Sequence, residues 1–178
     1  MKWAQMTSTV LGRALSLLVC LCLSMSNAIA AANTPQMVKP EGRTEIGLKG
    51  ASAGLIRLVI LQTKVGDSFP YKDALMWGGD VGELPQSALT SIQVQEGNEV
   101  IFVPLSAYGD LGDVKSASLD QTAQGFALNL HGGNTAAAYD ATLSFVKGYL
   151  VSRVVVLREF PEQRQERTSY QFPDRSHT

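Results

Sequence analysis

The chain has 178 residues, of which 45% are hydrophobic and 17% are charged, and its formal net charge is −1. This length and composition allow one globular domain with a hydrophobic core and argue against overall disorder. A phosphate backbone is held mainly by clustered Lys and Arg, so the lack of a basic excess argues against nucleic-acid binding.

The N-terminus has the pattern of a secretory signal peptide. A positively charged flank precedes an apolar run over residues 15–25, which is short for a membrane span. A small-x-small pattern predicts cleavage after Ala30, with Ala32 as the alternative site and an uncleaved anchor as the rival interpretation. We therefore expect residues 1–30 to be removed, and the protein to be exported to the periplasm or the extracellular space without a stable membrane span.

Both cysteines, Cys20 and Cys22, lie inside this segment. Neither follows the small residue that a lipoprotein signal needs, so we do not expect lipidation. Cleavage would leave a mature chain without disulfides, a thiol nucleophile or a thiolate metal site. It would also lower Lys+Arg from 15 to 13 against 16 Asp+Glu, a net charge of −3.

The mature chain begins with a polar stretch. Residues 31–43 contain two prolines, and we expect them to be a flexible lead into a single β domain over residues 44–173. Residues 44–48 alternate and predict a first short strand. Residues 55–63 are the most hydrophobic run, which predicts a strand that is covered on both faces or central in its sheet, with a buried helix as the rival.

Residues 64–87 form a long connection rich in glycine and proline, and it holds Trp77, the only tryptophan of the mature chain. Connections of this length are uncommon in compact domains and are often functional. Tryptophan is enriched at binding hot spots, so we expect a partner surface here. Asp80 and Glu83 could supply paired carboxylates for glycoside hydrolysis, although the general polarity of loops explains them better.

Three hairpins are predicted between residues 91 and 160. Their turns are Gly97-Asn98, of the type II′ kind, then residues 122–125, and then Lys147-Gly148. In the first two hairpins the predicted register pairs apolar residues across the strands: Val94 with Ile101, Ile92 with Val103, Leu119 with Leu128, and Ala117 with Leu130.

The third hairpin covers residues 139–160. A two-residue turn at Lys147-Gly148 predicts that positions summing to 295 face each other, so Phe145 pairs with Leu150 and Leu143 with Ser152. One face is then apolar apart from Ser152, and Arg153 belongs to the polar face.

Residues 105–113 interrupt the strands and predict a turn or one turn of helix. This stretch contains Tyr108, Asp110 and Asp113. Calcium loops carry denser oxygen ligands and a bidentate glutamate, so turn chemistry is the better interpretation of the two aspartates. His131 precedes two glycines at a strand end, where it could act as a general base but more often is simply solvated.

The C-terminal region is charged. Pro161 is expected to end or bend its strand, residues 162–167 to form a connection or a short helix, and residues 168–172 to form a last strand. Arg and Glu alternate in the connection, which predicts a solvated surface rather than an anion site. Residues 174–178 are expected to be a disordered tail.

These elements predict an all-β fold, an antiparallel meander of about seven or eight strands that forms a curled sheet, barrel or sandwich. We favour a curled sheet or barrel, because consecutive hairpins connect naturally as neighbours. The sequence contains no nucleophile elbow and no glycine-rich phosphate loop, and we expect no metal and no cofactor.

The resulting hypothesis is an exported, non-catalytic binding module of the inhibitory or immunity type, with another envelope or secreted protein as its partner. Alternatives are a small-ligand carrier with a barrel cavity and a carboxylate-based hydrolase. The candidate partner-binding residues are Trp77, Asp80, Glu83 and Tyr108.

Overall fold

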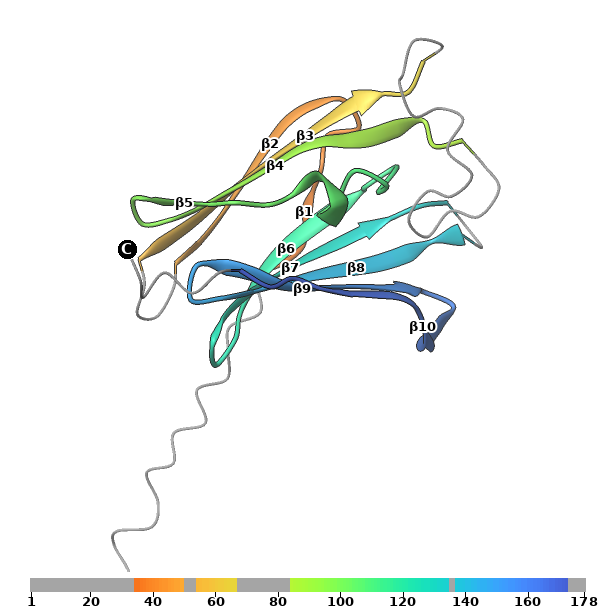
Figure 1. The fold of residues 1–178 in the computed structure, drawn as a ribbon. Helices are drawn as coiled ribbons and strands as arrows, with labels where there is room; N and C mark the ends of the chain where they lie inside the picture. Colours follow the sequence, from red (N-terminus) through yellow and green to blue (C-terminus); the bar gives the residue numbers. More distant parts are fainter. Residues whose placement is uncertain (1–33, 50–53, 67–83, 135–136, 173–178) are drawn as a thin grey trace, which may run out of the picture.

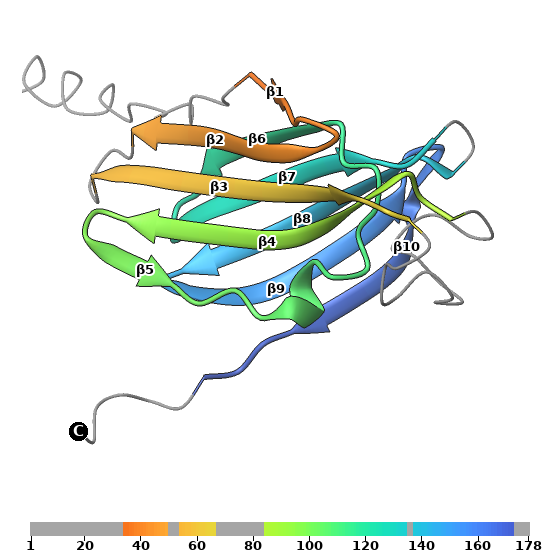
Figure 2. The same cartoon turned by 90° about the horizontal axis from the view of Figure 1, so that it is seen from above.

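The computed structural model describes residues 34–49, 54–66, 84–134 and 137–172, which form two antiparallel sheets packed face to face (Figures 1 and 2). The strands of the six-stranded sheet are, in spatial order, β1 (Gln36–Met37), β6 (Ser116–Gln121), β7 (Gly125–Gly132), β8 (Tyr139–Val146), β9 (Tyr149–Leu157) and β10 (Phe160–Ser169). The strands of the four-stranded sheet are β2 (Gly42–Lys49), β3 (Leu55–Lys64), β4 (Ser87–Glu96) and β5 (Glu99–Ile101).

This arrangement confirms the predicted all-β, antiparallel fold and identifies it as a sandwich. The preference for a curled sheet or barrel was wrong. After β5 the chain forms a short 3-10 helix, η1 (Leu105–Ala107), and crosses to the other sheet, so β5 and β6 are not paired. The expected turn at residues 105–113 is therefore confirmed, and it is the point where one sheet ends and the other begins.

The core lies between the two sheets. Along β7 and β8 every second side chain is buried, as expected for strands with one covered face. The aromatic rings of Phe126 and Phe145 stack with centroids 4.6 Å apart at an interplanar angle of 11°. Leu128 and Tyr139, at 0% exposure, belong to the same core. These side chains occupy the space that a carrier would need for a ligand, so the structure gives the carrier hypothesis no support.

Strand β3 is central in its sheet, between β2 and β4, as the sequence predicted. The alternative expectation, coverage on both faces, was wrong. Ile56, Leu58 and Ile60 point into the core, whereas Leu55 and Leu61 are 45% and 38% exposed. Because the described residues place no layer over the outer face of this sheet, only one side of the hydrophobic run is buried.

The first two hairpins have the predicted registers at three of the four expected pairs. Val94 lies opposite Ile101, Leu119 opposite Leu128, and Ala117 opposite Leu130. Gly97 has a φ of 60°, the left-handed value that a type II′ turn needs at its first central position. Strand β5 ends at Ile101, so the fourth pair, Ile92 with Val103, does not form.

The third hairpin follows the prediction only next to its turn. Phe145 lies opposite Leu150, but a register shift between Ser144 and Phe145 places Ser144 opposite Ser152 and Leu143 opposite Arg153. Such a β-bulge sets two residues against one and reverses the faces beyond it. Arg153, predicted on the polar face, therefore points inward and is only 3% exposed.

The charged C-terminal stretch is itself a strand. β10 begins at Phe160, includes Pro161 and pairs with β9 through two register shifts. The predicted connection over residues 162–167 and the separate last strand were wrong. Proline, charge and irregular pairing are all compatible with an edge strand, which has one side that needs no partner.

The predicted flexible lead is partly built into the fold. Gln36–Met37 pairs with β6, and Val38 is buried in the core. The buried Gln62 amide donates hydrogen bonds to the carbonyls of Lys39 (2.8 Å) and Val114 (2.9 Å), and accepts one from the Val114 N–H (3.0 Å). One side chain of β3 thus holds both the lead and the segment that enters β6.

Candidate functional site: a cleft at the hairpin end

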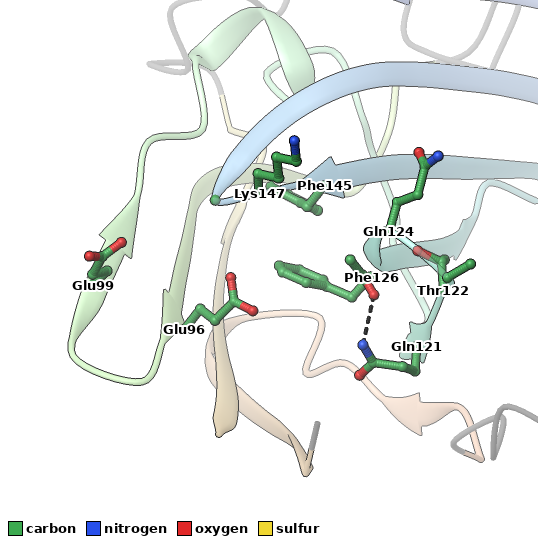
Figure 3. A pocket seen from close by; sticks show the side chains of 11 residues that line it. Glu96, Glu99, Gln121, Thr122, Gln124, Phe126, Phe145 and Lys147 are labelled. Carbon is green, nitrogen blue, oxygen red and sulfur yellow. Dashed lines mark hydrogen bonds between the residues drawn. The ribbon is translucent and has the colours of Figure 1, made fainter. Parts of the chain in front are cut away.

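Three hairpin turns, from both sheets, meet at one end of the sandwich and enclose an open cleft of about 490 Å³ (Figure 3). We call it the hairpin-end cleft. Its lining residues are Glu96, Glu99, Gln121, Thr122, Ala123, Gln124, Gly125, Phe126, Phe145, Lys147 and Gly148. The sequence predicted each of the turns but not that they would lie side by side.

The acidic wall of the cleft comes from the four-stranded sheet. Glu96 and Glu99 are direct partners across the turn, and the Gly97 N–H donates to the Leu55 carbonyl at 3.1 Å, which anchors the turn to β3. Side chains two residues apart on a strand share a face, so both glutamates lie on the side of Val94 and Ile101, toward the other sheet. Figure 3 shows them on the side opposite the amide-bearing turn.

The amide wall comes from the β6–β7 turn. The Gln121 side chain and the Thr122 N–H both donate to the Gly125 carbonyl, each at 2.9 Å. A Cβ on Gly125 would stand 2.1 Å from the Phe145 carbonyl oxygen, so only glycine fits there. The buried, stacked rings of Phe126 and Phe145 form the floor between the two walls.

Lys147 stands at the rim in a strained backbone conformation. Its φ is 50° and that of Gly148 is 77°, so both central residues of the turn are left-handed, as in a type I′ turn. Asn or Asp normally occupies the first of these positions, because a short polar side chain can hydrogen-bond to the nearby backbone and offset the crowding of Cβ. Lys147 therefore occupies a backbone conformation that its residue type rarely adopts, and it does so at the rim of the cleft.

The charges of the cleft are not neutralised within the described part of the chain. No ion pair found there involves Glu96, Glu99 or Lys147. The cleft thus offers two carboxylates, one ammonium group, two side-chain amides and a hydroxyl on an aromatic floor. Groups of this kind can bind a polar surface, and they contain neither a histidine base nor a thiol nucleophile.

The residues proposed from the sequence lie elsewhere. Trp77, Asp80 and Glu83 lie outside the described residues. Their connection leaves β3 at the end where Lys64 pairs with Ser87, which is the end of the ladder far from the hairpin-end cleft. Tyr108 is only 8% exposed and belongs to the core, which leaves little of its side chain to contact a partner.

The two aspartates of the 105–113 stretch have structural partners. Asp110 accepts a hydrogen bond from Arg153 at 2.6 Å. Asp113 accepts from the backbone N–H groups of Ser87 (2.8 Å) and Gln86 (3.2 Å), which fixes the start of β4. These contacts agree with the turn interpretation of the two residues. Within the described residues, no three His, Cys, Asp or Glu side chains come together as a metal site.

His131 lies on the outer face of the six-stranded sheet. Its Nδ1 is 2.6 Å from Asp140 Oδ1, and Arg158 also donates to that oxygen at 2.9 Å. Burial raises the pKa of Asp140, but the hydrogen bonds and charges of the two basic neighbours outweigh it, and the net pKa is below its usual value. Ser116 is the cross-strand partner of His131.

Ser, His and Asp are thus aligned across three strands, but nucleophilic catalysis needs a hydrogen bond between the hydroxyl and its base. The described structure has none between Ser116 and His131. We therefore interpret His131, Asp140 and Arg158 as a surface ion-pair cluster that supports the sheet.

Fold and cleft together define the class of the protein: an antiparallel β-sandwich with a polar, charged cleft at one end. Comparisons with protein-family models, curated proteins and solved structures gave no significant match to this chain. In the part of the chain that the structure describes, no helix has the length and apolar character to cross a membrane.

Proposed function

We propose that this protein is a non-catalytic binding module of the cell envelope that engages another envelope or secreted protein through the hairpin-end cleft. Residues 1–30 direct its export in this proposal, and the partner is a protein that the module inhibits or neutralises. Loops at one end of a rigid sandwich are a common place for recognition, because the sheets fix their positions.

The observation that carries the proposal is the combination of unpaired charge and backbone strain in the cleft. Glu96, Glu99 and Lys147 have no ion-pair partner among the described residues, and Lys147 occupies a left-handed position that asparagine would fill more comfortably. Charged rims of this type guide association and supply specificity when a partner provides the complementary groups.

Affinity capture from a periplasmic extract tests the proposal. The bait is the mature chain, and the comparison is the double variant Glu96→Gln/Lys147→Gln. Its control, Lys64→Gln/Glu162→Gln, removes the same kinds of charge from β3 and β10. We expect one protein to be retained by the wild type and the control and lost by the cleft variant. Equal retention by the two double variants, or no retained protein, would contradict the proposal.

A second measurement addresses export. A full-length chain should appear in the periplasmic fraction shortened by the length of residues 1–30, whereas a chain lacking those residues should stay in the cytoplasm. Mass spectrometry of the mature N-terminus checks the cleavage site after Ala30.

A further inference from the structure

The four edge strands of the sandwich are β1, β10, β2 and β5, and they differ in how they are protected from added strands. β10 carries Pro161, charged residues and two register shifts, all of which block pairing. β1 has only two residues, and β2 lies against β6 of the other sheet. β5 is also short, with three residues, but it lacks the other devices: Glu99 is its only charged residue, and uncharged residues follow as far as Pro104.

The backbone of β5 offers hydrogen-bonding groups at its free edge. Glu96 faces Glu99 at the turn, Gln95 faces Val100, and Val94 faces Ile101. Antiparallel pairs alternate between hydrogen-bonded and non-hydrogen-bonded, starting from a hydrogen-bonded pair at a two-residue turn. The N–H and C=O of Val100 therefore point away from β4, and no backbone hydrogen bond outside the ladders uses them among the described residues.

The side chains next to this edge are unusually exposed for their type. Val100 is 79% exposed and Phe102 is 69% exposed, and the two lie on the outer face of the sheet because Ile101 between them is buried. Leu105, at 50%, continues the apolar surface. A strand laid along β5 would cover these side chains with its own residues on the same face.

The opposite face of β5 leads into the hairpin-end cleft. Glu99 and its partner Glu96 point to that side, and neither has a cationic partner among the described residues. A residue of the added strand opposite Glu99 would project toward both carboxylates. Within the described part of the chain, the surface thus combines a backbone edge with no neighbouring strand, an apolar outer side and an acidic inner side.

We propose that β5 binds an extended segment of the partner protein as an added strand, with apolar residues opposite Val100 and Phe102 and a Lys or Arg opposite Glu99. The inference rests on the proposed binding function and specifies its recognition mode, β-strand addition. Charge complementarity selects this occupant over a second copy of the chain. If two β5 strands paired with each other, residues 99–104 of either copy would offer no Lys or Arg to lie opposite Glu99, and both copies carry a net negative charge.

The test uses a short fluorescein-labelled peptide in which valine and threonine alternate and a lysine replaces the threonine at the end opposite Glu99. Fluorescence anisotropy measures its affinity for the mature chain. We expect saturable binding that Val100→Pro weakens by about tenfold or more, because proline removes the outward N–H and leaves the ladder to β4 intact. The same peptide with N-methyl groups on the amides facing β5 should bind as weakly, and this arm leaves the protein unchanged.

A charge swap tests the acidic side. The Glu99→Lys variant should bind the lysine peptide about tenfold more weakly than the wild type does. A peptide with glutamate in place of that lysine should restore the affinity for the variant. Glu162→Lys on β10 is the matched control and should leave the affinity unchanged. Absence of binding, indifference to N-methylation, or failure of the swap would each overturn the inference.

Sedimentation of the wild-type chain tests whether a second copy of the chain, and not a partner segment, covers β5. If the protein dimerises and Val100→Pro makes it monomeric, a second copy covers β5 and the inference is wrong. The proposed function and the inference can fail separately. If capture of the partner depends on Lys147 but not on Val100 or Phe102, binding at the cleft stands and strand addition at β5 is excluded.

Discussion

Arg153→Met is the substitution that tests the packing of the bulged hairpin most sharply. The Arg153 side chain is 3% exposed and donates to Asp110 Oδ2 at 2.6 Å and to Glu166 Oε1 at 3.0 Å. Methionine fills much of the same volume, so the change removes the charge with limited loss of packing. It leaves two carboxylates without their cation.

The size of the expected loss of stability depends on how exposed the two carboxylates that pair with Arg153 are. Breaking a fully buried ion pair costs about 3–5 kcal/mol, because one charge is stranded away from water. The side chains of Asp110 and Glu166 are 35% and 41% exposed, so water can rehydrate them. We therefore expect the free energy of unfolding to fall by about 2 kcal/mol, which corresponds to a decrease of about 5 °C in Tm.

Urea unfolding followed by circular dichroism measures this change. Arg158→Met is the control, because its ion pair with Asp140 lies at the surface, where its side chain is 50% exposed, and should be worth no more than about 0.5 kcal/mol. If Arg153→Met is as stable as the wild type, or if the two variants lose the same amount, then Arg153 is not the buried, inward-facing residue that the bulge implies.

Three further predictions concern the cleft turns and the surface ion pairs. Lys147→Asn should stabilise the fold by about 0.5–1 kcal/mol in urea unfolding, because asparagine tolerates a left-handed φ, while it weakens partner binding; a destabilised variant would contradict the strain argument. Gly125→Ala should destabilise by at least about 2 kcal/mol or prevent folding, since its Cβ would meet the Phe145 carbonyl oxygen, and a thermal melt like that of the wild type would refute this. The lowered pKa of Asp140 stabilises the fold above its usual pKa of 3.8, and this contribution is lost as the pH falls through the lowered value. Urea midpoints measured from about pH 5 to pH 2 should therefore fall less steeply for Asp140→Asn, and parallel curves would exclude the effect.

The first two hairpins could be predicted because their registers depend on local information. The loop length and the positive φ of Gly97 set the pairing of Val94 with Ile101, and a four-residue loop does the same for Leu119 and Leu128. Turn geometry and alternation agree in both cases, so nothing from the rest of the fold changes the result.

The register of the third hairpin could not be predicted from local information beyond its turn. Its alternation already contained a conflict, since Ser152 opposite Leu143 broke the apolar face. The bulge resolves that conflict by turning Ser152 outward and Arg153 inward, and it is stable because Asp110 and Glu166 meet the guanidinium. Those partners come from η1's following turn and from β10, which the sequence of the hairpin does not contain.

The hairpin-end cleft was missed for a related reason. Each turn was predicted, but their meeting depends on how the chain crosses between sheets after β5. The one local signal was Lys147 at a turn position that favours asparagine, which the structure shows as a left-handed residue at the rim. The stronger signals in the sequence, Trp77 and its long connection, lie outside the described residues.

Site-specific photocrosslinking in living cells tests whether the hairpin-end cleft is the surface that binds the partner. A photoreactive amino acid is placed at Gln124, which is exposed in the hairpin-end cleft, and at Lys64, which is exposed at the other end of β3. We expect one envelope or secreted protein to be crosslinked from position 124 and not from position 64, and we expect Lys147→Gln to reduce the yield of this crosslink. A partner crosslinked only from position 64 would contradict the assignment of the cleft as the binding surface.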